Sequence, residues 1–280
     1  MVRVSTVLDP PDLGEVPDVR LIALDMDGSL LDQDKRLDPS FWPLLEQLEA
    51  RGIAVCPASG RQYATLRAQF GRDDLVYIAE NGAYVVHDGA ELSSDTLLTP
   101  TALAIVETIR AARGLDVGTV VCGKRSAYVE RADEAFLAQA RPYYARLEVV
   151  EDLLAVDDEI LKVAVYEFGD VSRGAAPALA RFDDADRVVV SGEHWVDVMS
   201  ATADKGTALQ QVQAALGITR EQTMAFGDYF NDVGMLEAAA WSFAMDNGHP
   251  DVRALARFVA PANTRNGVVR TIASALRIEL

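Results

Sequence analysis

The sequence predicts an α/β fold in which a parallel-sheet core is interrupted by an inserted α+β domain. At both ends of the chain, short apolar runs alternate with helical patterns, which is typical of strand–helix units forming a parallel sheet with right-handed crossovers. In the middle, neighbouring strand-like segments flank turn residues, which indicates an antiparallel sheet. We expect an N-terminal extension over residues 1–17, a core over 18–83 and 195–280, and an inserted domain over 84–194.

The N-terminal part of the core repeats the strand–helix unit. Asp38 stands where an N-cap is expected, and Gly52 and Gly71 follow the two predicted helices, where the left-handed conformation ends a helix. The expected strands cover 21–24, 53–56 and 75–79, and the expected helices cover 39–51 and 62–70.

The middle of the chain changes to paired strands with interleaved helices. Asp88-Gly89, between two strand-like runs, is a typical hairpin turn. The expected strands cover 83–87, 91–98, 117–121, 126–130, 161–168 and 187–190, and the expected helices cover 101–113, 133–146 and 175–182.

The strand–helix pattern returns towards the C-terminus. A helix closed by Gly217 follows one strand, and a second strand stops at Gly227-Asp228. The expected strands cover 196–199, 223–226, 242–245 and 258–260; the expected helices cover 205–216, 233–240 and 267–278, with one more between the last two strands.

Composition restricts the class of protein. Half of the 280 residues (50%) are hydrophobic, enough for a large core. The 43 acidic and 26 basic side chains give a net charge of −17, which repels nucleic acid and anionic membranes. No run is apolar enough to span a bilayer, the start does not resemble a signal peptide, and Cys56 and Cys122 lack metal-site spacing. We therefore expect a soluble, cytoplasmic protein with free thiols and without nucleic-acid or membrane partners.

Polar residues gather where predicted core strands end. Asp25-Met26-Asp27-Gly28-Ser29 places two carboxylates after the first strand, at the edge where open α/β sheets bind ligands. Ser59-Gly60-Arg61 follows the second strand and precedes a helix, where a hydroxyl and backbone N–H groups can hold phosphate. Taken alone, each segment is also compatible with a solvated turn or a helix cap.

Two further segments add charge to the same edge. Lys205 begins a helix although the helix dipole disfavours a cation there, which indicates an anionic partner. The string from Gly227-Asp228 to Asn231-Asp232 follows an apolar strand, and its oxygens suit a hard cation.

Together and in this order, the four segments resemble the four motifs of the haloacid dehalogenase superfamily of phosphohydrolases. Glu80-Asn81-Gly82-Ala83, the helix start at Lys205-Gly206 and the segment 263–268 are similar to its Cof-type branch. The resemblance implies a Rossmann-like core with a large α/β cap inserted between the second and third motifs. The chain departs from the pattern at Asp246-Asn247-Gly248 and in lacking a glycine within 200–204.

The resemblance also implies a role for each motif residue. Asp25 would be the nucleophile that forms an aspartyl-phosphate, and Asp27 the general acid and then base. Mg²⁺ would be bound by Asp25, by the main-chain carbonyl of Asp27 and by Asp228, with Asp232 supporting the metal waters or Lys205. The phosphoryl oxygens would be contacted by Ser59, Gly60, Arg61, Lys205 and Asn231.

The implied activity is magnesium-dependent removal of phosphate from a small phosphorylated metabolite. Sugar phosphates are the first expectation, followed by pyridoxal phosphate and flavin mononucleotide. Two alternatives stay open: a phosphosugar mutase and a non-catalytic metabolite-binding member of the fold. The large central insertion argues against the mutase, and the presence of Asp25, Asp27 and Lys205 argues against the sensor. The candidate residues of the cap for reading the leaving group are Lys124, Arg125, Tyr128 and His194, each of which is also compatible with an ordinary surface or packing role.

Overall fold

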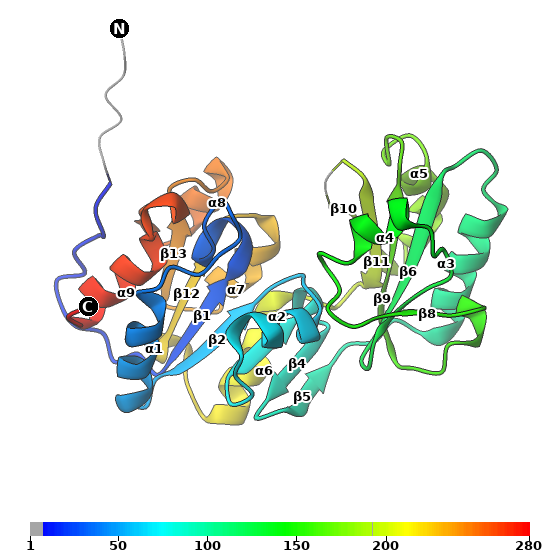
Figure 1. Cartoon of the computed structure of the whole chain (residues 1–280). Coiled ribbons are helices and arrows are strands. Elements are labelled where there is room, and N and C mark those ends of the chain that lie inside the picture. The colour runs from blue at the N-terminus through cyan, green and yellow to red at the C-terminus, as the bar shows by residue number, and fades with distance from the viewer. Residues whose placement is uncertain (1–7, 192) are drawn as a thin grey trace, which may run out of the picture. The chain divides into compact units, whose positions relative to one another are not determined.

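The structure is a computed structural model that describes residues 8–191 and 193–280 (Figure 1). Part of the predicted extension, residues 1–7, lies outside the described residues. The chain divides into two compact units. The core unit comprises the residues up to Ser59, Asp73–Leu92 and Asp204–Leu280, and the inserted unit comprises Gly60–Arg72 and Ser93–Ala203.

The core unit contains an eight-stranded sheet in the order β14-β13-β12-β1-β2-β3-β4-β5. Every neighbouring pair from β14 to β3 is parallel, and β4 runs antiparallel to β3. This arrangement confirms the predicted α/β class. The strands are β1 (Leu21–Asp25), β2 (Ala54–Ala58), β3 (Val76–Ala79), β4 (Tyr84–His87), β5 (Ala90–Ser94), β12 (Thr223–Gly227), β13 (Trp241–Met245) and β14 (Phe258–Ala260).

Helices cover both faces of this sheet because its central strands are apolar on both sides (Figure 1). Residues Leu21 and Ala23 of β1 pack in one cluster with Leu209 and Met235, so α6 and α7 cover that face. On the core unit, α1 and α9 contact each other, and α1 also contacts β2. The helices are α1 (Phe41–Ala50), α6 (Lys205–Leu216), α7 (Val233–Glu237), α8 (Pro250–Leu255) and α9 (Gly267–Leu276).

The inserted unit contains a six-stranded sheet in the order β10-β11-β9-β6-β7-β8. Its strand pairs are antiparallel except β7 and β8, which are parallel. Residues of α3 and α5 pack on one face of the sheet and residues of α4 on the other. The elements are α2 (Tyr63–Phe70), α3 (Thr99–Ala111), β6 (Val117–Gly123), β7 (Ala127–Val129), α4 (Glu134–Ala140), β8 (Leu147–Val149), β9 (Ile160–Glu167), α5 (Ala175–Leu179), β10 (Asp186–Val190) and β11 (Trp195–Ser200).

The hairpin around Asp88-Gly89 forms as predicted, but it extends the eight-stranded sheet. The sequence pattern predicts it at the start of the inserted domain. The connection between β3 and β4 is only the turn Glu80–Gly82 and Ala83, and so short a connection returns the chain beside the strand it has just left.

The strand expected at 196–199 also lies in the other sheet. As β11, it pairs antiparallel with both β9 and β10. Its valines Val196 and Val198 are buried in the cluster that includes α3 and α5. An apolar run of this length fits either sheet, and the hairpin with β10 decides which one it joins. The second unit consequently ends at Ala203 rather than at residue 194.

The helix expected at 133–146 ends as α4 at Ala140. Pro142 explains the early end, because proline lacks the N–H that would continue the helical hydrogen bonds. The residues that follow form the unpredicted strand β8 beside β7.

Within residues 8–191 and 193–280, no helix combines the length and the apolar character that crossing a membrane requires.

Gly206 provides a test of the packing between α6 and α7. A Cβ at this position would lie 2.3 Å from the backbone carbonyl carbon of Gly234. Because that contact is with backbone, we expect Gly206→Ala to lower the free energy of unfolding by about 1–3 kcal/mol in urea denaturation. Thr207→Ala, an exposed change in the same helix, should alter it by less than about 0.5 kcal/mol. Equal stability of the Gly206 variant and the native protein would contradict this account of the packing.

Candidate active site

Three polar residues lie at the carboxyl ends of neighbouring parallel strands of the core unit. Asp25 is the last residue of β1, Ser59 follows β2 and Asp228 follows β12. Because β1 pairs with both β2 and β12, the carboxyl ends of these strands meet at one edge of the sheet. The sheet thus brings together three of the residues that the sequence predicted for the site.

Lys205 is buried between two carboxylates. Its Nζ donates to Asp25 Oδ1 at 2.6 Å and to Asp232 Oδ1 at 2.7 Å, and the side chains of Lys205 and Asp232 are fully inaccessible to solvent. The lysine starts α6 because Asp204 caps the helix, accepting hydrogen bonds from the N–H groups of Gly206 and Thr207. The anionic partner inferred from a lysine at a helix start is therefore a pair of aspartates.

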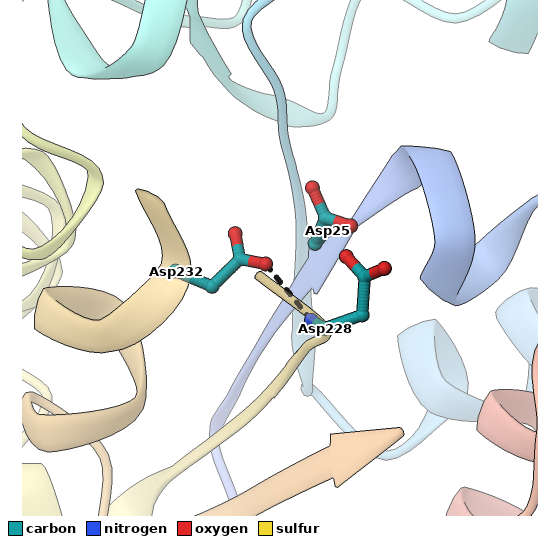
Figure 2. Close-up of side chains that lie close together, drawn as sticks. All are labelled: Asp25, Asp228 and Asp232. Atoms are coloured by element: carbon teal, nitrogen blue, oxygen red, sulfur yellow. Dashed lines mark hydrogen bonds between the residues drawn. The ribbon is translucent and has the colours of Figure 1, made fainter. Parts of the chain in front are cut away.

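Asp232 organises the segment around Asp228. Its Oδ1 accepts from Lys205. Its Oδ2 accepts from the N–H of Asp228 at 2.9 Å, the bond drawn in Figure 2, and from the N–H of Tyr229 at 3.2 Å. Both of its oxygens are thus engaged by the protein. This pattern supports a positioning role for Asp232 more than direct ligation of a cation.

Asp25, Asp228 and Asp232 form an acidic cluster whose nearest oxygens all lie within 4.8 Å of one another (Figure 2). Among the described residues, the buried Asp25 Oδ2 has no hydrogen-bond partner. Gly28 leaves room for Asp228: a Cβ at Gly28, whose φ is +86°, would lie 2.2 Å from Asp228 Oδ2. The donor set of carboxylate oxygens fits a hard divalent cation beside Asp25 and Asp228.

Burial and like charges perturb the acids of this cluster. Burial and the carboxylate of Asp232 raise the pKa of Asp25 to about 8, although Lys205 opposes the change. Burial and Asp232 also raise the pKa of Asp228 to about 6. Burial lowers the pKa of Lys205, but Asp232 and Asp25 outweigh it and hold that pKa above its ordinary value. Three carboxylates around one ammonium leave excess negative charge, which a bound cation would balance.

Asp27 lies outside the buried cluster, in the tight loop Met26–Leu30. Its side chain is 38% exposed, and its Oδ1 lies 2.7 Å from Lys35 Nζ. Two asparagines hold the loop from elsewhere in the chain: Asn247 donates to the carbonyl of Gly28, and Asn263 donates to the carbonyl of Leu31. Asp27 is thus a partly solvated acid near a buried one, a difference of environment that suits proton transfer.

Asn81 connects two predicted phosphate-contacting residues. Its backbone N–H donates to the carbonyl of Ser59, and its side-chain oxygen accepts from Asn231 Nδ2 at 3.1 Å. The residue adopts a left-handed backbone conformation with φ +55°, which asparagine tolerates better than most residues. The sequence marked Glu80-Asn81-Gly82 only as a family feature. We had not predicted Asn81, Asn247 or Asn263 as site residues, although the position of Asn81 after a strand end could have indicated the first.

Gly60 and Arg61 belong to the inserted unit, where the carbonyl of Gly60 accepts from Lys162 Nζ at 3.3 Å. Arg125 and Tyr128, two of the expected cap residues, line a cavity of about 520 Å³ in the same unit. Their side chains both contact Asp158.

The other two expected cap residues also have partners within the inserted unit. Lys124 forms an ion pair with Glu159, and the ring of His194 lies within hydrogen-bond distance of the carbonyl of Glu167.

The fold and the site together define an α/β enzyme whose acidic cluster, with one buried lysine, lies at the carboxyl edge of a parallel sheet. Residues 22–272 match the family of haloacid dehalogenase-like hydrolases, and the chain belongs to this family.

Named phosphatases are similar to the chain over almost its whole length. It is 32% identical to the 5-amino-6-(5-phospho-D-ribitylamino)uracil phosphatase YbjI of Escherichia coli strain K12, covering 93% of this chain and 97% of that protein. It is 29% identical to the pyridoxal phosphate phosphatase YbhA of the same strain, covering 92% and 98%. The crystal structure of SMU.1108c from Streptococcus mutans UA159 superposes with a TM-score of 0.80 at 28% identity, covering 92% and 99%. The predicted family and class of enzyme, a phosphatase of the haloacid dehalogenase type, are confirmed.

The raised pKa of Asp228 predicts how the metal-free protein responds to pH. A carboxyl whose pKa is about 6 when folded and 3.8 in its ordinary state binds protons more readily in the folded state. Its ionised form therefore destabilises the fold above pH 6, and this penalty disappears as the pH falls from about 6 to about 4. In a chelator at pH 7.5, Asp228→Asn should unfold at a higher temperature than the native protein.

The difference in unfolding temperature should shrink as the pH is lowered to about 4, measured by differential scanning calorimetry. The exposed Asp34→Asn provides the control and should show no such crossover. A variant of Asp228 that is less stable than the native protein at pH 7.5 would contradict the electrostatic account.

Proposed function

We propose that the chain is a magnesium-dependent phosphohydrolase that removes phosphate from a small phosphorylated metabolite through an aspartyl-phosphate on Asp25. One observation carries this proposal. Asp25 is a buried carboxylate at a strand end, with one oxygen held by Lys205 and the other without a hydrogen bond among the described residues. A carboxylate that serves as nucleophile and metal ligand needs this arrangement, in which one oxygen is held in place and the other is not engaged in a hydrogen bond.

The proposed site resolves an electrostatic conflict. A phosphate monoester is a dianion, whereas the chain carries −17 overall and several acids at the site. Bound Mg²⁺ would supply positive charge that neutralises the phosphoryl oxygens. The proposed ligands are the carboxylates of Asp25 and Asp228 and the main-chain carbonyl of Asp27. Lys205, close to Asp25, adds the second positive charge.

In the first half of the reaction, a carboxylate oxygen of Asp25 attacks phosphorus. An O–P bond to Asp25 forms as the bond to the leaving alkoxide breaks, and Asp27 donates a proton to that oxygen. In the second half, Asp27 takes a proton from a water that attacks the same phosphorus. Phosphate leaves and the Asp25 carboxylate is regenerated. The partial exposure of Asp27 allows it to exchange protons with solvent between turnovers.

The phosphoryl oxygens need donors around this line of attack. The proposed donors in the core unit are the hydroxyl of Ser59, the ammonium of Lys205 and the side-chain amide of Asn231. The bond from Asn231 to Asn81, together with the backbone bond from Asn81 to Ser59, supports this set because it ties two of the donors to one loop. The loop Gly60-Arg61 is proposed to add backbone N–H groups.

We propose that the inserted unit acts as a cap that excludes water and selects the leaving group, with the residues of the core unit providing the chemistry. The enzyme is proposed to work in the cytoplasm without nucleic-acid or membrane partners. The acidic charge supports this, as do Cys56 and Cys122, which are both buried.

Sugar phosphates are the proposed class of substrate. YbjI is named for a substrate with a phosphorylated ribityl chain, which is a sugar alcohol, and this supports the proposal. Pyridoxal phosphate, for which YbhA is named, and flavin mononucleotide are the next compounds to test.

Replacing the nucleophile tests the mechanism. Asp25→Asn removes the negative charge and most of the nucleophilicity while preserving the shape of the side chain. We expect kcat for p-nitrophenyl phosphate to fall by at least about 10³-fold, measured as released phosphate, with the protein still folded by circular dichroism. Asp34→Asn, the same chemical change at an exposed position of the neighbouring loop, should retain native activity. Near-native turnover by the Asp25 variant would exclude the aspartyl-phosphate mechanism.

Removal of the cation tests the metal. Dialysis against EDTA should abolish phosphate release, and millimolar Mg²⁺ should restore it. Mg²⁺ should also raise the unfolding temperature of the native protein, because a ligand that binds only the folded state stabilises it. The same addition should leave Asp228→Asn unchanged. Full activity in EDTA would contradict the metal requirement, and restoration by another divalent cation alone would replace magnesium.

A further inference from the structure

Lys162 is a buried cation on a largely apolar sheet face. It lies on β9 of the inserted unit, and its side chain is 6% exposed. Side chains alternate along a strand, so Lys162 shares its face with Ala164 and Tyr166, which lie in the cluster that includes α4. A buried ammonium is costly unless it is compensated, so its presence in this strand calls for a role.

Asp197 compensates the charge. Its Oδ2 lies 3.7 Å from Lys162 Nζ, and the aspartate side chain is 10% exposed. It projects from β11, which pairs with β9, and it also accepts a hydrogen bond from Ser191 Oγ at 3.3 Å. The two charges of the pair are thus held by the neighbouring strands β9 and β11 of the six-stranded sheet.

The ammonium of Lys162 reaches the backbone of the loop that follows Ser59. Its Nζ donates to the carbonyl oxygen of Gly60 at 3.3 Å. In a planar trans peptide the carbonyl and the N–H of the next residue point in opposite directions. Lys162 therefore fixes the direction of the Arg61 N–H, which points away from the ammonium.

Other bonds fix the rest of this segment to the inserted unit. Gln62 exchanges side-chain hydrogen bonds with the backbone of Arg146. The hydroxyl of Thr65 donates to the carbonyl of Tyr143 and accepts from the N–H of Ala145. The loop is thus anchored at its far end by neutral hydrogen bonds and, next to Ser59, by a charged one.

We propose that Lys162, held by Asp197, is a positioning residue for phosphate binding: it orients the Gly60–Arg61 peptide so that its N–H meets the phosphoryl group. The inference rests on the proposed function, in which this loop contacts phosphate. It assigns to the inserted unit a part in binding the phosphoryl group, besides selection of the leaving group.

Lys162→Met tests the inference in the full-length, magnesium-loaded protein. Loss of one charge-assisted hydrogen bond to the loop should raise both KM for p-nitrophenyl phosphate and the inhibition constant of inorganic phosphate by about tenfold. We expect kcat to change less than about threefold, because Asp25 and Asp27 are intact. The variant should also be less stable, since it leaves Asp197 buried and unpaired.

The double variant Lys162→Met/Asp197→Leu separates positioning from stability. Replacing both charges with apolar side chains should restore the unfolding temperature towards the native value, because neither charge of the pair is then left buried without the other. The raised KM and phosphate inhibition constant should persist, because the donor to Gly60 is still absent. Recovery of native KM and inhibition constant in the double variant would overturn the proposal and leave the pair a purely structural role.

Arg131→Met is the matched control. Arg131 also donates to a main-chain carbonyl of the inserted unit, that of Val117, and pairs with carboxylates. Its loss should lower the unfolding temperature without changing KM or phosphate inhibition. If the native protein releases no phosphate, the proposed function fails. If it does and Lys162→Met binds phosphate as the native protein does, the positioning role alone fails.

Discussion

The ammonium of Lys205, buried between Asp25 and Asp232, is the interaction on which the site depends. It allows two carboxylates to be buried at a sheet edge, which would otherwise be strongly unfavourable. It also links three separate segments, because Asp25 ends β1, Lys205 starts α6 and Asp232 follows β12. Asp232 in turn fixes the backbone of Asp228. One cation therefore sets the orientation of the proposed nucleophile and of the acid proposed to bind metal.

Close backbone packing makes this arrangement possible. Gly28 allows the loop after β1 to approach the carboxylate of Asp228, and Gly206 allows α6 to approach the start of α7. Gly28 lies beside Asp228 in space, and Gly206 follows Lys205 in the sequence. The small residues of the motifs are thus as necessary to the geometry as the charged ones, because any side chain there would displace a carboxylate or a helix.

The sequence was sufficient for the family and the class of enzyme but not for every boundary. Asp25, Ser59 and Asp228 could be placed together because parallel strands bring their carboxyl ends to one edge, a rule independent of side-chain detail. Strand pairing is different. The runs at 84–94 and 195–200 have the composition of strands in either sheet, and short connections at Glu80–Gly82 and before Trp195 decide which sheet they join. Asn81 was missed as a site residue because its contacts depend on a left-handed turn.

The charge distribution explains why a strongly acidic chain can bind an anion. Repulsion from distant surface carboxylates is screened by salt over about 10 Å, whereas charges inside a buried site are screened much less. The local balance at the phosphoryl position therefore decides binding. Lys205 and a cation beside Asp25 and Asp228 would offset the acids there, and backbone N–H groups add partial positive charge without a counter-ion. A backbone N–H group contributes only if it points towards the phosphoryl oxygens. Lys162, which is paired with Asp197, is proposed to orient the N–H of Arg61 in this way because it binds the carbonyl of Gly60 in the same peptide.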